Sequence, residues 1–232
     1  TVNTECVDEQ LRTKYQQLIG KLMYLATKTR PDIAFATVYL SQFTSNPSSE
    51  HWKALKRLLR YLNGNRKRGV LLDNKACNNE LVVYCDADYG NNYDLKSFSG
   101  ILFLLNGCTF NWICNKQSVI ATSTTHAECL SALQATKEVI WLRDLLLELG
   151  YPQNGPVTLH SDSQPAIKLL SKPDFNKRTK HFNMLVHIVK EQILDRNVRF
   201  IYVQTDQQLA DFLTKSVPCT KLVDALKGAK LH

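Results

Sequence analysis

The chain has 232 residues, of which 44% are hydrophobic, and it carries a net charge of +8. This composition excludes a disordered chain as the default, allows one sizeable domain and a smaller one, and favours a polyanionic partner, with nucleic acid as the leading candidate. The seven cysteines form no Cys-x-x-Cys pair, and no apolar run approaches the roughly 20 residues of a membrane span, so we expect reduced intracellular thiols and no membrane partner.

Three helices are predicted in the first 74 residues. Residues 15–25 place apolar side chains at helical spacing, and Pro31 fits the first turn of a second helix. Ser48 and Ser49 offer cap chemistry for a third helix that runs to Leu62. The short connections predict a small antiparallel bundle. We place the domain boundary near residue 75, so that residues 1–74 form one unit and residues 75–232 another.

The third predicted helix carries a basic stripe opposite its apolar side. Lys53, Lys56, Arg57 and Arg60 follow the spacing i, i+3, i+4 and i+7. Such a stripe often serves only solubility, but the following basic cluster at residues 66–68 and the net charge favour contacts with phosphates. We expect these contacts to position a nucleic-acid duplex without reading its sequence.

Strands and helices alternate beyond residue 75. Apolar runs at 81–84 and 100–105, with an Asn106-Gly107 turn leading into 108–113, predict three antiparallel strands. The later predicted elements are helices over 125–149, 164–171 and 178–195, strands over 156–161 and 198–203, and a tail helix from Pro218. The order βββαβααβα predicts a mixed five-stranded α/β sheet with helices on its faces.

Four acids fall near predicted ends of these elements. They lie in the motifs Cys85-Asp86-Ala87-Asp88, Thr124-Thr125-His126-Ala127-Glu128, His160-Ser161-Asp162-Ser163-Gln164 and Leu209-Ala210-Asp211-Phe212-Leu213-Thr214-Lys215. Separate elements can aim such carboxylates at one point, where they can hold two divalent ions about 4 Å apart for phosphodiester hydrolysis. Mg²⁺ prefers these hard oxygen ligands. The motifs therefore predict a two-metal site.

Each acid taken alone has a structural alternative. Asp86 could be a solvated acid at a strand end, and Glu128 could complete a capping box with Thr125. Asp162 could cap the following helix, and Asp211 could be an acid favoured by a helix dipole. The alternatives are at least as good as metal binding for a single acid. The four acids together, in this order, favour metal binding.

The order Asp, Glu, Asp, Asp resembles the catalytic set of ribonuclease H. The surrounding residues resemble the Pol polyprotein of copia-type LTR retrotransposons over nearly the whole chain. Residues 15–62 resemble the thumb or connection segment that ends the reverse transcriptase, and residues 80–215 resemble its ribonuclease H domain. The latter match includes Trp141-Leu142, the Arg178-Thr179-Lys180-His181 motif and the motif that ends at Lys215. The start at Thr1 then suggests a fragment or a processed polyprotein product.

This resemblance implies a fold, an activity and a set of site residues. The fold is a ribonuclease H-like sheet, and the activity is two-metal-ion hydrolysis of the RNA strand of RNA/DNA hybrids during reverse transcription. Asp86, Glu128, Asp162 and Asp211 would be both metal ligands and catalytic residues, with two Mg²⁺ ions or Mn²⁺ as a substitute. The basic stripe and the motif residues Arg178, Lys180 and His181 would contact nucleic acid. Selectivity for RNA would come from contacts to the 2′-OH.

The resemblance also implies partners and a location. The partners are an RNA/DNA hybrid and either the palm and fingers domains of the reverse transcriptase or a second Pol subunit, without a small-molecule cofactor. The chain has no Tyr-x-Asp-Asp pair, so polymerase activity is not expected. The implied location is the cytoplasm, within virus-like particles, or the nucleus.

Two other functions stay open from the sequence. The chain could be a catalytically weak or host-adopted module that binds hybrids, or an assembly segment for the reverse transcriptase. Cellular ribonucleases H carry a His shortly before the last Asp, and residues 203–208 contain none. His126 and His160 lie beside the acids and could replace it, although structural roles are favoured for both. Integrases differ from this chain in the order of their catalytic acids, because their Glu comes last.

Overall fold

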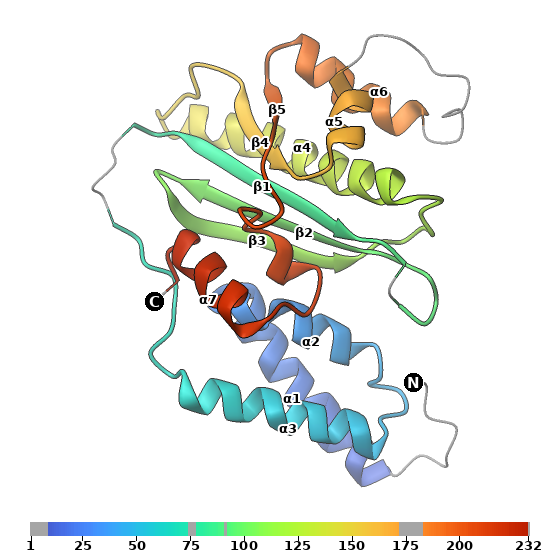
Figure 1. Cartoon of the computed structure of the whole chain (residues 1–232). Helices are drawn as coiled ribbons and strands as arrows, with labels where there is room; N and C mark the ends of the chain where they lie inside the picture. The colour runs from blue at the N-terminus through green and yellow to red at the C-terminus, as the bar shows by residue number, and fades with distance from the viewer. Residues whose placement is uncertain (1–8, 74–77, 91, 172–182, 232) are drawn as a thin grey trace.

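The computed structural model describes residues 9–73, 78–90, 92–171 and 183–231. Its centre is a five-stranded sheet with the strand order β3-β2-β1-β4-β5 (Figure 1). The strands are β1 (Leu81–Asp88), β2 (Phe98–Leu105), β3 (Cys108–Lys116), β4 (Val157–Ser161) and β5 (Val198–Tyr202). The first three strands are antiparallel, whereas β4 pairs in parallel with β1 and β5. The predicted mixed five-stranded α/β sheet is therefore confirmed.

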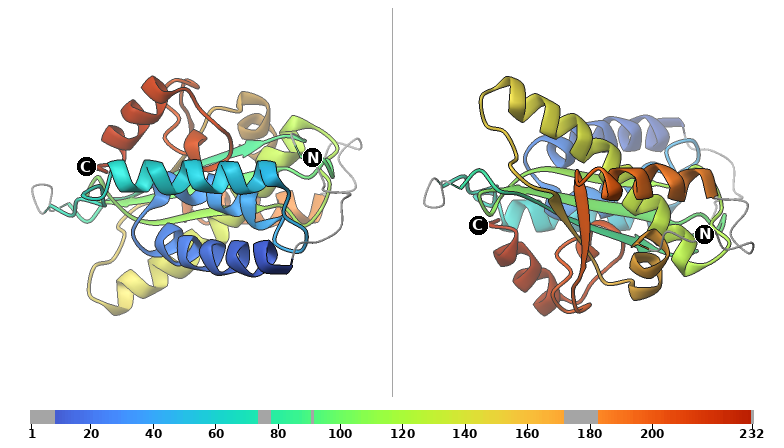
Figure 2. Two further views of the ribbon diagram at one scale, coloured as in Figure 1. Left: turned by 90° about the horizontal axis from the view of Figure 1, so that it is seen from below. Right: turned by 90° about the horizontal axis from the view of Figure 1, so that it is seen from above.

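Helices cover both faces of the sheet (Figures 1 and 2). One face carries α4 (Thr124–Glu148), α5 (Gln164–Ser171) and α6 (Asn183–Leu194), whose apolar side chains share a core with the strands. The opposite face carries α1 (Glu9–Lys28), α2 (Ala34–Ser41) and α7 (Cys219–Gly228). The remaining helix, α3 (Ser49–Gly64), packs outside this second layer.

The three amino-terminal helices form as the sequence predicts. A short 3₁₀ turn at Pro31–Ile33 leads into α2, and Ser48 caps α3 in a capping box with His51. The hydroxyl of the fully buried Tyr15 on α1 donates to the Leu40 carbonyl on α2 over 2.9 Å. This hydrogen bond satisfies the polar end of a side chain that otherwise packs in an apolar core.

The helical bundle and the sheet share one core. The apolar cluster on this side contains Tyr15 and Leu55 from the helices together with Leu102 from β2. The carboxyl-terminal tail also reaches the helical segment, since Leu71 donates its backbone N–H to the Lys230 carbonyl over 2.9 Å. The predicted linker falls partly on residues 74–77, outside the described residues, and the boundary at residue 75 stays a prediction.

A buried ionic network fastens α3 to the start of α2. Arg30 donates two hydrogen bonds to the Asp32 carboxylate, over 2.8 and 2.7 Å, and a third to the Asn65 carbonyl over 3.0 Å. Tyr61 donates its hydroxyl proton to Asp32 over 2.8 Å and accepts from Arg68 over 2.7 Å. Because the Asp32 side chain is fully buried, these bonds replace the water that it loses on folding.

Most predicted boundaries agree with the structure to within a few residues. Asn106 and Gly107 adopt φ values of 54° and 72°, as a tight hairpin turn between β2 and β3 requires, and Gly150 ends α4 with a φ of 85°. Residues 178–182 of the predicted helix over 178–195 lie outside the described part. Among the described helices, none combines the length and the apolar character that a membrane span requires. The described cysteines are free thiols.

Candidate metal centre

Three carboxylates meet beside the carboxyl end of β4, where it lies next to β1. Asp86, Glu128 and Asp162 each offer an oxygen, and these oxygens lie within 4.8 Å of one another. Tyr84 pairs with His160 in the register of β1 and β4, so the same register extended by two residues sets Asp86 beside Asp162. Asp86 lies inside β1, which continues to Asp88, and not at a solvated strand end as one alternative required. It is only 2% exposed.

Glu128 reaches this group because another residue caps its helix. The Ser123 hydroxyl accepts from the His126 backbone N–H over 3.1 Å and so caps α4. The alternative capping box of Thr125 and Glu128 is therefore wrong. The Ser131 hydroxyl donates to the Asp86 carbonyl over 2.9 Å and fastens the first turns of α4 to β1. The Glu128 side chain is free to point at the acids.

The fourth acid arrives on a turn that rests directly on the sheet. Asp211 begins a short 3₁₀ helix, Asp211–Leu213, that packs over Gly100 of β2, the residue paired with Asp86. A Cβ atom at Gly100 would lie 2.6 Å from Thr214 Cγ2 and 2.8 Å from Leu213 Cβ. This close approach lets the Thr214 hydroxyl donate to Asp86 Oδ2 over 2.5 Å. The absent side chain of Gly100 thus brings Asp211 to the site.

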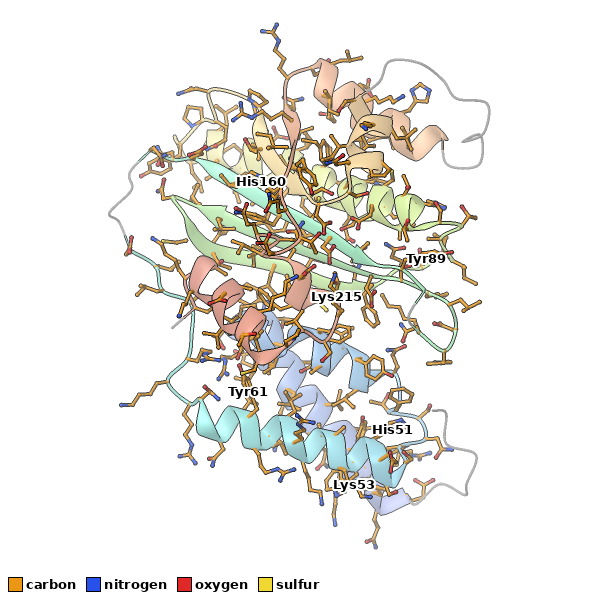
Figure 3. The ribbon with its side chains drawn as sticks, in the orientation of Figure 1. His51, Lys53, Tyr61, Tyr89, His160 and Lys215 are labelled. Atoms are coloured by element: carbon orange, nitrogen blue, oxygen red, sulfur yellow. The ribbon has the colours of Figure 1, made fainter. Side chains whose placement is uncertain are left out.

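Asp211 differs from the other three acids because two lysines hold it. Lys215 Nζ lies 2.9 Å from Asp211 Oδ1 and 3.7 Å from Asp86 Oδ2. Lys221 of α7 forms an ion pair with Asp211 Oδ2 and donates to the Thr205 carbonyl over 2.9 Å. Figure 3 shows Lys215 between the sheet and the helical layer that contains α7 and α2.

Burial and mutual repulsion disfavour the charged forms of these acids. Burial raises the pKa of Asp86 to about 7, Lys215 opposes this rise, and the charges of Asp211 and Asp162 add to it. Burial, followed by the charges of Asp86 and Asp162, raises the pKa of Glu128 well above its usual range. Glu128 Oε2 is buried and finds no hydrogen-bond donor among the described residues. Hard, closely spaced carboxylate oxygens whose negative charges outnumber the nearby ammonium groups fit a divalent cation such as Mg²⁺.

The two neighbouring histidines have structural surroundings. The His160 ring stacks on Tyr84 with their centroids 4.7 Å apart, and His126 Nδ1 accepts from the Thr122 backbone N–H over 3.2 Å. Burial lowers the pKa of both imidazoles, which keeps them neutral near pH 7. These contacts agree with the structural roles that the sequence favoured for them.

The structure does not place the residues predicted to bind nucleic acid beside the four acids. The stripe residues Lys53, Lys56, Arg57 and Arg60 are all exposed on α3, and Figure 3 shows Lys53 on this lower helix and His160 on the sheet, with the helical layer between them. Arg57 also lines a pocket of about 840 Å³ between α2, α3 and the sheet, which Lys215 lines from its other side. Arg178, Lys180 and His181 lie outside the described residues.

Four contributors to this site were absent from the sequence prediction. Thr214, Lys215 and Lys221 contact Asp86 or Asp211, and Gly100 makes room for the turn that carries Thr214. A signal for Lys215 was present, because it follows Asp211 by four residues in the same motif. The roles of Gly100 and Lys221 depend on strand register and on the path of the tail, which no local pattern shows.

Comparisons with known proteins place the chain in a family. No family model matches the chain. It is 39% identical over 211 residues to the retrovirus-related Pol polyprotein from transposon TNT 1-94 of Nicotiana tabacum, which covers 90% of this chain and 16% of that protein. The corresponding polyprotein from transposon RE1 of Arabidopsis thaliana is 38% identical over 209 residues, with 90% of this chain and 14% of the relative covered.

A shorter relative and a solved structure complete the comparison. The secreted RxLR effector protein 161 of Plasmopara viticola is 43% identical over 129 residues, which are 55% of this chain and 90% of that protein. The solved structure of LC11-RNase H1, isolated from compost, is 16% identical with a TM-score of 0.47, and the match covers 64% of this chain and 99% of that one. The chain spans about one sixth of the TNT 1-94 polyprotein, and it belongs to the family of retrovirus-related Pol polyproteins of transposons.

Proposed function

We propose that the chain is a ribonuclease H that hydrolyses the RNA strand of RNA/DNA hybrids during reverse transcription of an LTR retrotransposon. The observation that carries this proposal is the convergence of Asp86, Glu128 and Asp162, with their oxygens within 4.8 Å of one another. Asp211 adjoins them and adds its charge to the field at Asp86. Membership of the Pol family supports the same function.

The acids would hold divalent metal ions, two Mg²⁺ ions or Mn²⁺ in their place. Bound ions would activate the attacking water and stabilise the leaving oxygen. Asp86, Glu128 and Asp162 would hold one ion, and Asp86 with Asp211 would hold the other. The Thr214 hydroxyl fixes the orientation of the Asp86 carboxylate through its hydrogen bond, and burial of both groups keeps competing water away.

The substrate would be positioned by basic and polar side chains. The exposed stripe from Lys53 to Arg60 on α3 would contact phosphates, and Arg57 would extend these contacts along the pocket that it shares with Lys215. Contacts to the 2′-OH would distinguish the RNA strand from the DNA strand. The palm and fingers domains of a reverse transcriptase or a second Pol subunit would be the protein partners.

One observation favours the weaker alternative of a hybrid-binding module. Both carboxylate oxygens of Asp211 are paired with lysines, so this acid reaches a metal ion only after at least one pair opens. A protein in which the pairs stay closed would bind hybrids and cut them slowly.

Cleavage of a labelled RNA/DNA hybrid in Mg²⁺ or Mn²⁺ tests the proposal. An Asp162→Asn protein and an all-DNA duplex serve as controls. We expect metal-dependent cutting of the RNA in the hybrid alone, and loss of cutting in the variant because Asp162 supplies one of the three grouped carboxylates. Tight binding of the hybrid without cutting in either metal would contradict the nuclease proposal and favour the binding module.

A further inference from the structure

We propose that Lys215 occupies the place of the second metal ion, so that the chain binds one divalent ion readily and a second ion only when Lys215 is displaced. This inference deepens the proposed function and rests on it in one respect, namely that the acids bind divalent cations. It assigns Lys215 a positioning role between Asp86 and Asp211.

The ammonium group of Lys215 lies between Asp86 and Asp211. Lys215 Nζ lies 2.9 Å from Asp211 Oδ1 and 3.7 Å from Asp86 Oδ2, which puts a positive charge between the two acids. An Mg²⁺ ion shared by these acids would lie about 2.1 Å from an oxygen of each. The ion and the ammonium group would therefore occupy the same space. One must leave before the other binds.

Both carboxylate oxygens of Asp211 form ion pairs with lysines. Lys221 pairs with its other oxygen and is itself fixed by a 2.9 Å hydrogen bond to the Thr205 carbonyl. Consistent with this, the group of carboxylates whose oxygens converge within 4.8 Å contains Asp86, Glu128 and Asp162. The structure thus separates a ready site of three acids from a fourth acid that two lysines occupy.

The charges of the four acids also favour a single ion. Four ionised carboxylates carry four negative charges, which two ammonium groups and one divalent ion neutralise completely. A second ion would add two positive charges, of which displacement of Lys215 removes one and a phosphate of the substrate can balance the other. The protein's own lysines therefore favour one ion in the absence of nucleic acid, since buried charges need matched partners.

Titration with Mn²⁺ alone tests this inference without any measurement of cleavage. Isothermal titration calorimetry at pH 8 counts the ions, and electron paramagnetic resonance detects a coupled pair about 4 Å apart. The proteins are the wild type, Lys215→Met, and Lys230→Met as a matched control. Lys230 is 31% exposed and pairs with Asp73 over 3.4 Å, and Lys215 is 34% exposed.

We expect the wild type and Lys230→Met to bind one ion tightly. Lys215→Met should bind the second ion at least on the order of tenfold more tightly than the wild type, because a unit positive charge has been removed from its place, and should show a coupled pair. Should Lys215→Met fail to fold, Lys221→Met is measured in its place. It should raise the affinity for the second ion by a smaller factor, since Lys221 pairs with the other oxygen of Asp211.

The inference is overturned if the wild type binds two ions with similar affinities, or if neither lysine substitution changes the affinity for the second ion. These outcomes are distinct from a failure of the proposed function. A protein that cuts hybrids yet binds two equal ions contradicts only the role of Lys215. A protein that gains the second ion on substitution but never cuts a hybrid contradicts only the nuclease proposal.

Discussion

Two buried clusters of charged side chains in this molecule differ in whether the protein itself neutralises their charge. In the network on the helical side, the Asp32 carboxylate accepts two hydrogen bonds from Arg30 and one from Tyr61. At the end of the sheet, Asp86, Glu128 and Asp162 lie together, and Glu128 Oε2 has no donor among the described residues. The first cluster is neutralised from within the protein. The second is left with excess negative charge.

This difference separates a structural role from a functional one. Burial of a carboxylate costs several kcal/mol unless partners replace its water, and Asp32 has such partners. The acids of the sheet are kept close together against their repulsion, by strand register, by the Ser123 cap and by the turn over Gly100. Such an arrangement is favourable only when a cation from outside completes it. Substitutions should therefore act in opposite ways in the two clusters.

The largest effect is expected from Asp32→Asn. Loss of this carboxylate leaves Arg30 buried without its charge partner, and we expect the free energy of unfolding to fall by about 3–5 kcal/mol. Urea unfolding measures the change. The matched control is Glu50→Gln, since Glu50 forms an exposed pair with Lys53 over 4.0 Å and should matter by less than about 0.5 kcal/mol. A loss below about 1 kcal/mol for Asp32→Asn would show that the network is not structural.

The next effect is a dependence of stability on pH. The pKa of Asp86 is raised from 3.8 to about 7 in the folded state, so its contribution to stability is fully present below about pH 4 and is lost as the pH rises to about 7. Glu128, whose pKa burial also raises, adds to this loss, because the folded state favours the protonated form of both acids. Urea unfolding between pH 4 and pH 8 in a chelator measures it.

Divalent cations and a substitution sharpen this test. Mn²⁺ should restore stability at pH 8 and have little effect at pH 4, because only the ionised acids bind it. Asp86→Asn should weaken the pH dependence in the chelator, and the part that remains should come from Glu128, whose pKa burial also raises. An unchanged profile in this variant would assign the pH dependence to other groups.

Glu128→Gln should abolish most of the cleavage while the fold persists. We expect hybrid cleavage to fall at least about a hundredfold, since a direct ligand should matter no less than a residue that merely orients one. The folded protein without metal should become more stable, because a source of repulsion at Asp86 is removed. Glu138→Gln, ten residues further along α4, is the control. If Glu128→Gln destabilises the fold, Glu128 has a structural role like that of Asp32 and is not a metal ligand.

The smallest effect is expected from Gly100→Ala. The new Cβ would meet Thr214 Cγ2 at 2.6 Å and push the turn that carries Asp211 away from β2. Overpacking of this kind costs about 1–3 kcal/mol of stability, and cleavage should fall as well because Thr214 loses its bond to Asp86. Gly69→Ala, which has open space around its Cβ position, should change neither. Full activity in Gly100→Ala would show that cleavage does not need the close packing of this turn on Gly100.

The sequence predicted the parts of this molecule that depend on local patterns. The Asn106-Gly107 turn, the Ser48 cap and the helix that ends at Gly150 lie where residue preferences set them. The acids were found because their order and surrounding motifs resemble a family. Their surroundings were found only in part. Ser123 and Lys215 lie three and four residues from their partners His126 and Asp211, where local spacing could have indicated them, whereas Gly100 acts through packing against a turn far away in the chain. The partner set of Asp32 was hidden for the same reason, since Tyr61 lies 29 residues away.

The most direct test of the central claim is anomalous diffraction from crystals grown in Mn²⁺ at pH 8. We expect a strong peak within bonding distance of carboxylate oxygens from Asp86, Glu128 and Asp162, where three acids converge within 4.8 Å. Absence of a peak at these acids, with Mn²⁺ bound elsewhere or not at all, would contradict the claim that they are held together for a cation.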